Sequence, residues 1–159
     1  MRASEFEVVF VFIAAFLAGC FAILPALVLE TVVALFQPDV LQSVFLNALT
    51  EELLKLLAFF AILFVCNDLS KEETVFTAAL IGFGFGFSEN ILFSVLVPAS
   101  SALEFISFRI VAPLPMHVIS TALVGFGFSQ SKKNPLNLIL FFALAVALHF
   151  AFNSFFLFF

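Results

Sequence analysis

Charge is what this sequence has least of. Only 11% of its 159 residues are charged, whereas soluble domains carry about a quarter. Hydrophobic residues make up 64% of the chain. This composition excludes an ordinary soluble domain and indicates a helical protein that crosses the bilayer several times. The length suffices for one compact bundle, so residues 1–159 are predicted to form a single transmembrane domain.

Tryptophan and tyrosine are absent, although the chain has 27 phenylalanines. Their absence removes the usual aromatic belt at the membrane interfaces, so depth has to be argued from charged residues. The two cysteines, Cys20 and Cys66, lack a metal-binding or redox spacing and are expected to be packing residues. No basic arm or stripe is present, which argues against nucleic acid as a partner.

Five apolar segments of about 22–25 residues are long enough to span a bilayer with some tilt. They cover residues 6–29, 42–66, 74–97, 105–128 and 136–158. Residues 30–36 are apolar but short, and could form a brief interfacial or re-entrant piece. The expected fold class is therefore all-α: a polytopic membrane protein with a bundle of about five transmembrane helices.

The basic residues outside these spans all fall on one side of a five-span arrangement; they are Arg2, Lys71, Lys132 and Lys133. Cytoplasmic loops carry the excess of lysine and arginine in membrane proteins. The N-terminus is therefore predicted to lie in the cytoplasm and the C-terminus outside, in the cell (plasma) membrane.

The second span carries three charged residues, Glu51, Glu52 and Lys55. Each costs about 2.5–3.5 kcal/mol at the bilayer centre, so three unpaired charges would cost on the order of 8–10 kcal/mol. Glu51 and Lys55 lie four residues apart on one helix face, in the favoured order for an ion pair. Glu52, rotated by about 100°, is then expected to need a partner from another helix.

The third span supplies a further buried acid. Gly82 and Gly86 form a small-xxx-small pair that lets a neighbouring helix approach closely. Glu89 lies on nearly the same face, so this packing would deliver its carboxylate into the interior of the bundle.

The last two spans carry the remaining polar residues. Arg109 precedes His117 by about two turns, with Pro113 and Pro115 between them. Two prolines kink or unwind a helix. At membrane depth, a non-helical backbone is tolerated only where it is buried inside the protein or lines a water-filled cavity. In the fifth span His149 and Asn153 share one face.

The acids and histidines are predicted to lie in one layer, about 12–18 Å from the outer ends of their spans at 1.5 Å per residue. The three acids against Lys55 and Arg109 leave a formal charge of −1 with neutral histidines. One carboxylate is therefore expected to share a proton with a histidine, an arrangement that suits a general base. A hydrated cavity about halfway down, open to the outer leaflet or outer face, is expected with it.

Four motifs in chain order resemble those of the PrsW family of intramembrane proteases, which belongs with the CAAX prenyl endopeptidases. They are Glu51-Glu52-x-x-Lys55, Phe85-x-x-x-Glu89-Asn90, the stretch from Arg109 to His117, and His149-x-x-x-Asn153. The resemblance implies a glutamic-type peptidase without metal or cofactor that cleaves membrane-anchored proteins, anti-sigma-factor-like proteins among them.

The resemblance also implies roles for individual residues. Glu51 or Glu52 would be the base, with His117 as its partner. His149 and Asn153 would stabilise the oxyanion, and the two cations Lys55 and Arg109 would offset the acids. The sequence departs from the CAAX pattern at Glu89, where a histidine is expected, so either Glu89 or His117 would fill the second-motif role.

Three other functions fit parts of the pattern. Three glutamates and two histidines could bind Zn²⁺ in a metallopeptidase, although no His-Glu-x-x-His is present. Intramembrane acids and histidines also form relays in proton- or cation-coupled transporters, but the inverted repeat expected there is not evident. A non-catalytic membrane scaffold would retain binding without proteolysis.

Overall fold

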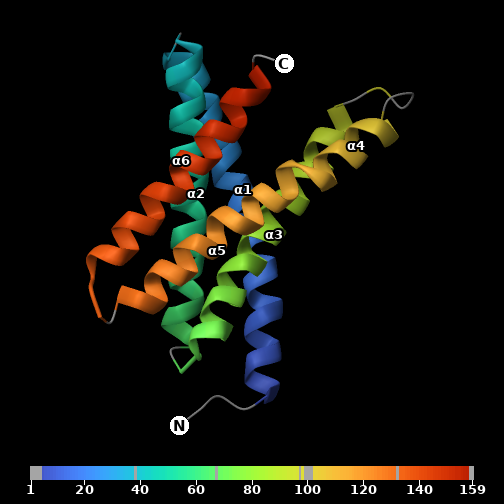
Figure 1. Cartoon of the computed structure of the whole chain (residues 1–159). Coiled ribbons are helices and arrows are strands. Elements are labelled where there is room, and N and C mark those ends of the chain that lie inside the picture. Colours follow the sequence, from blue (N-terminus) through green and yellow to red (C-terminus); the bar gives the residue numbers. More distant parts are fainter. Residues whose placement is uncertain are drawn as a thin grey trace.

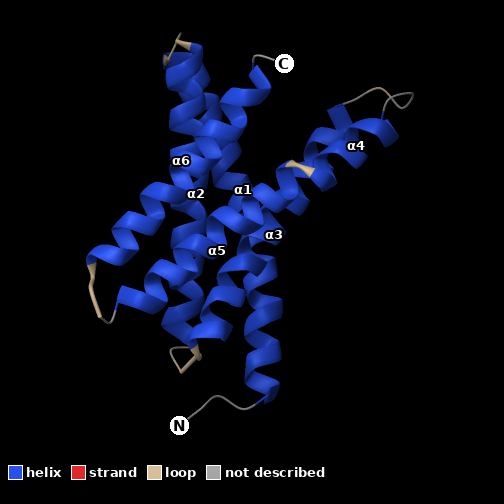
Figure 2. Ribbon diagram, viewed as in Figure 1, coloured by secondary structure: helices blue, strands red, loops and turns tan. Residues whose placement is uncertain are grey.

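The computed structural model describes residues 5–37, 39–66, 68–96, 98, 102–131 and 133–157. These residues form helices joined by short loops, without a strand among them (Figure 2). The helices are α1 (Glu5–Phe36), α2 (Val40–Val65), α3 (Lys71–Leu96), α4 (Ala102–Val111), α5 (Pro113–Ser131) and α6 (Leu136–Leu157). The predicted all-α membrane fold class is confirmed.

Four segments are long and apolar enough to cross a membrane. They are Phe6–Phe36, Lys71–Leu96, Leu103–Ser131 and Leu136–Leu157. The segment Leu103–Ser131 joins α4 and α5. Helix α2, the second predicted span, is not among these four, because its middle carries the charged residues Glu51, Glu52 and Lys55. All three are buried in the bundle.

Two of the predicted segments have other bounds in the structure. Residues 30–36 are the last two turns of α1, which continues past Pro25 to Phe36. The fourth predicted span is two helices, because Ala112 ends α4 and Pro113 begins α5. Neither Pro113 nor Pro115 has a backbone N–H for the helical ladder, so the predicted break is observed. The predicted span ends at 97 and 158, and Arg2 and Lys132, lie outside the described residues.

Helix α3 lies at the centre of the bundle, with α1 on one side and α5 on the other. A side chain at Gly84 would overlap the carbonyl of Phe16 in α1, and one at Gly82 would overlap the carbonyl of His117 in α5. A Cβ at Gly86 would lie 2.8 Å from the imidazole of His117. The predicted close approach at Gly82 and Gly86 is confirmed.

The start of α1 and the end of α6 lie at opposite ends of the bundle (Figure 1). The C-terminal half of α3, together with α4, leans away from the upper ends of α2 and α6. Helices α4 and α6 contact each other through the rings of Phe108 and Phe156, whose centroids are 5.2 Å apart. The bundle is therefore tightly packed at its centre and splayed at one end.

Candidate active site

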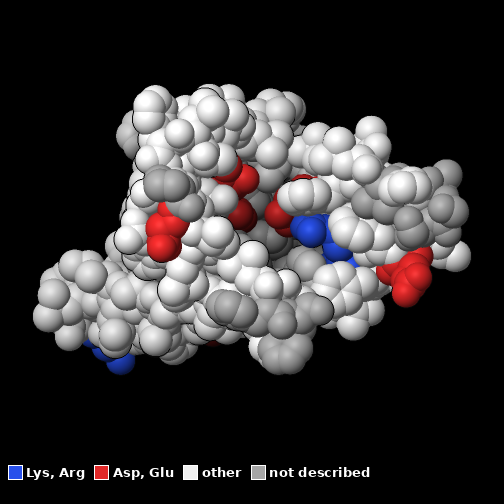
Figure 3. Space-filling view, turned by 90° about the horizontal axis from the view of Figure 1, so that it is seen from above, with Lys and Arg blue, Asp and Glu red and all other residues white. Residues whose placement is uncertain are grey.

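A cavity of about 510 Å³ lies where the helices splay. All six helices line it, each with at least one polar residue, and α3, α4 and α6 also contribute aromatic residues. Figure 3 looks onto this end of the bundle and shows the hollow, with acidic atoms inside it and basic atoms beside them. The structure therefore contains a cavity lined by polar side chains, and its predicted hydration and outward opening stay predictions.

Glu52 is fully buried and accepts three hydrogen bonds at Oε1. The donors are Lys55 Nζ at 2.5 Å, His149 Nδ1 at 2.8 Å and Ser120 Oγ at 2.9 Å. The predicted pairing of Lys55 with Glu51 is wrong. The buried Lys55 ammonium lies 3.1 Å from Nδ1 of His117 in α5, and on that side of α2 its carboxylate partner is Glu52.

Glu89 forms a second set of contacts on the other side of His117. Its Oε2 accepts from Arg109 Nη2 at 2.6 Å and lies 2.9 Å from His117 Nε2. Arg109 Nε also donates to Asn90 Oδ1 at 2.7 Å. Arg109 is thus held inside the bundle by Glu89 and Asn90, consistent with its predicted role of offsetting an acid.

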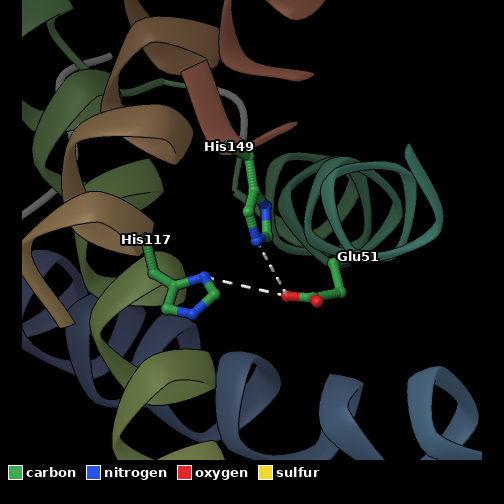
Figure 4. Close-up of side chains that lie close together, drawn as sticks. All are labelled: Glu51, His117 and His149. Carbon is green, nitrogen blue, oxygen red and sulfur yellow. Dashed lines mark ion pairs between the residues drawn. The ribbon is translucent and has the colours of Figure 1, made fainter. Parts of the chain in front are cut away.

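Glu51 lies between the two histidines (Figure 4). Its Oε2 is 3.6 Å from His149 Nε2 and 3.8 Å from His117 Nδ1. This oxygen is buried and accepts no hydrogen bond from the described residues. Glu30 of α1 interacts with Glu51 through its side chain and lines the same cavity.

The neighbouring carboxylates determine which nitrogen of each neutral histidine carries no proton. An ionised carboxylate can only accept hydrogen bonds, so His149 donates from Nδ1 to Glu52 and His117 donates from Nε2 to Glu89. In the neutral rings, Nε2 of His149 and Nδ1 of His117 then carry lone pairs. These are the two nitrogens nearest to Glu51 Oε2.

The described structure thus brings the predicted acids and histidines together, and their catalytic roles stay a prediction. Asn153 lines the cavity one turn beyond His149. A family model described as PrsW family intramembrane metalloprotease matches residues 7–159, which is nearly the whole chain. The chain belongs to the PrsW family. Comparisons with curated proteins and with solved structures give no match.

Membership of the PrsW family makes this chain an intramembrane protease by family and a multi-pass membrane protein. Proteases of this kind act on membrane-anchored proteins within the lipid bilayer. The described helices agree with that environment, because large apolar side chains cover their outward faces while the charged cluster is enclosed.

The PrsW family description names a metalloprotease, and the residues of this PrsW-family site fit a divalent transition ion. Ligand atoms of Glu51, His117 and His149 lie within 4.8 Å of one another, and two histidines with a glutamate are a known zinc ligand set. Each imidazole donates its other N–H to a carboxylate, as metal-binding histidines do. One contact opposes this fit, since Lys55 Nζ lies 3.1 Å from Nδ1 of His117, the nitrogen that would bind the ion.

The charge balance of the PrsW-family site also suits a cation. Four glutamates, Glu30, Glu51, Glu52 and Glu89, face one lysine and one arginine, which leaves a formal charge of −2 with neutral histidines. The sequence-based count of −1 leaves out Glu30, because the first predicted span ends at residue 29.

Three residues of the PrsW-family site were missed from the sequence: Glu30, Asn47 and Ser120. Glu30 could have been found, because an acid within the apolar run from Phe6 to Phe36 is costly in a bilayer. Ser120 lies three residues after His117 and so on the same helix face. Asn47 precedes Glu51 by one turn, but a neutral amide in a span is common and indicates little by itself.

Proposed function

We propose that this chain is an endopeptidase that hydrolyses peptide bonds of membrane-anchored proteins at the floor of the cavity. The observation that carries the proposal is Glu51. Its Oε2 is buried, lacks a hydrogen-bond partner among the described residues and faces ring nitrogens of His117 and His149. The resemblance of the motifs to PrsW further supports substrates of the anti-sigma-factor type.

In the glutamic-type form of this proposal, Glu51 is the general base and takes a proton from the attacking water. Glu89 orients His117, so these two residues fill the second-motif role together. His149 and Asn153 donate to the oxyanion that forms on the substrate carbonyl. Because Nδ1 of His149 already donates to Glu52, this role requires a doubly protonated ring.

A metal-assisted form is the second candidate, and the charge balance favours it. Glu51, His117 and His149 would hold the ion, while Glu52 and Glu89 would fix the orientation of the two imidazoles. A bound divalent ion would supply a Lewis acid and lower the pKa of bound water. Lys55 would have to leave Nδ1 of His117 for that nitrogen to become a ligand.

Cleavage and metal content can be measured on one preparation. We expect the purified protein to cut a single-span substrate at a bond within the bilayer, mapped by mass spectrometry. About one equivalent of a transition metal, whose removal by a chelator abolishes turnover, would support the metal-assisted form. Full turnover by metal-free protein would contradict the metal-assisted form and favour the glutamic-type form. Absence of cleavage from every single-span candidate would contradict the proposed function.

We propose that the chain lies in the plasma membrane with the start of α1 in the cytoplasm. The start of α3, at Lys71, and the connection between α5 and α6, which contains Lys133, lie at the same end of the bundle as the start of α1 (Figure 1). This supports the orientation. In a variant lacking Cys20 and Cys66, a cysteine at Ser70 is expected to react with an impermeant maleimide only after the cells are permeabilised. Labelling of intact cells at that position would show that the opposite orientation is the correct one.

A further inference from the structure

Asn47 occupies a distinctive place in the cavity. It lies on α2 four residues before Glu51, so the two side chains share a helix face, and both line the cavity. The two positions are separated by about 6 Å along the helix axis. An extended peptide covers that distance in about two residues.

The amide of Asn47 is incompletely hydrogen-bonded. Its Oδ1 is buried and has no hydrogen-bond partner among the described residues. A buried polar atom without a partner costs about 1–3 kcal/mol, and such atoms are rare in folded proteins. A donor on a molecule that entered the cavity and reached this oxygen would give it the partner that it lacks.

The chemistry of the cavity identifies that molecule. Its upper walls are aromatic and apolar, with Phe93, Phe108, Phe152 and Phe156 among them, so they suit an apolar peptide. A peptide bond becomes accessible only where a transmembrane helix unwinds, and each backbone group freed in the bilayer then needs a new partner. A carboxamide has both an acceptor and donors, which matches the peptide group.

We propose that Asn47 is a substrate-positioning residue whose side-chain amide hydrogen-bonds the main chain of an unwound transmembrane segment, about two residues from the cleaved bond. This inference rests on the proposed function, because it assumes that the cavity receives a peptide. Asn47 acts on the register of the substrate and takes no part in the proton transfers at Glu51.

The kinetic test uses Asn47→Leu, which keeps the branching and the number of heavy atoms of the side chain and removes its hydrogen bonds. We expect KM to rise about tenfold, with kcat nearly unchanged. The variant should be at least as heat-stable as the parent, because an unpartnered polar atom has been removed. Asn137→Leu, outside the cavity on α6, is the matched control for kinetics. An unchanged KM, or an equal loss in kcat with a lowered melting temperature, would overturn the proposal.

A binding test separates this inference from the proposed function. In the Glu51→Gln background, a labelled apolar single-span peptide is expected to bind about tenfold more weakly when Asn47 is leucine. Peptides with one main-chain N–H at a time replaced by an ester oxygen are then compared. We expect one such replacement to weaken binding to the Asn47 protein and to leave binding to the Asn47→Leu protein unchanged.

Two results can be told apart in this way. Equal peptide affinities with and without Asn47 would overturn the inference, whatever the parent protein cleaves. A tenfold difference in affinity with no cleavage by the parent protein would uphold Asn47 as a peptide-binding residue and overturn the proposed function.

Discussion

Replacing Glu51 with glutamine is expected to lower kcat/KM for a membrane-anchored substrate by about 10²–10⁴-fold. Glutamine keeps the size of the side chain but can neither take a proton from water nor bind a cation as a carboxylate does. Because Oε2 of Glu51 accepts no hydrogen bond from the described residues, the fold should not depend on its charge. The measurements are the initial cleavage rate and the melting temperature of the purified variant.

Glu104→Gln is the control for Glu51→Gln, because Glu104 is an exposed acid in the first turn of α4. It should leave both the cleavage rate and the melting temperature near the parent values. Turnover by Glu51→Gln at the parent rate would contradict the central role given to Glu51 in both forms of the proposed mechanism.

Replacing Lys55 with methionine is expected to lower the free energy of unfolding by about 3–5 kcal/mol, because the fully buried carboxylate of Glu52 loses its cation. The ammonium also lies 4.8 Å from the centre of the Phe85 ring, so a favourable cation–ring contact is lost with it. Chemical unfolding in detergent or lipid, monitored by circular dichroism, would measure the loss.

A second substitution shows whether the unpaired charge is the cause. The double variant Glu52→Gln with Lys55→Met should recover most of the lost stability, because glutamine can still accept from Ser120 and His149 without a buried charge. Lys71→Met, at an exposed position at the start of α3, should change stability by less than about 0.5 kcal/mol. A Lys55→Met protein as stable as the parent would show that the ion pair contributes nothing to the fold.

The meeting of charged residues from separate spans could be predicted from the sequence, since a bilayer leaves buried charges no partner except one another. Composition and segment length were enough for the all-α membrane fold. The close approach at Gly82 also followed from the sequence, because the spacing of small residues determines where two helix backbones can touch.

The partner of each charge could not be predicted. Glu51 and Glu52 are neighbours on α2, and both are within reach of Lys55 on the same helix, at four and three residues. The rotation of α2 decides which of the two acids faces His149. An amphipathic helix would reveal its rotation through its polar face, but α2 is apolar on nearly all sides except at the site itself. The place of Glu30 in the site could not be predicted either. Glu30 lies in α1 only because that helix runs to Phe36, and the length of a tilted helix depends on its packing, which segment length alone does not give.

The glycines of α3 have a consequence for motion within the protein. Contacts of Gly84 with α1 and of Gly82 with α5 are made by backbone atoms, so α3 cannot rotate or slide without collision on either side. Between α4 and the end of α6, the rings of Phe108 and Phe156 make a contact of a kind that contributes about 0.5–1.5 kcal/mol. A movement of α4 away from the end of α6 would therefore cost less free energy than a movement of α3 past its neighbours.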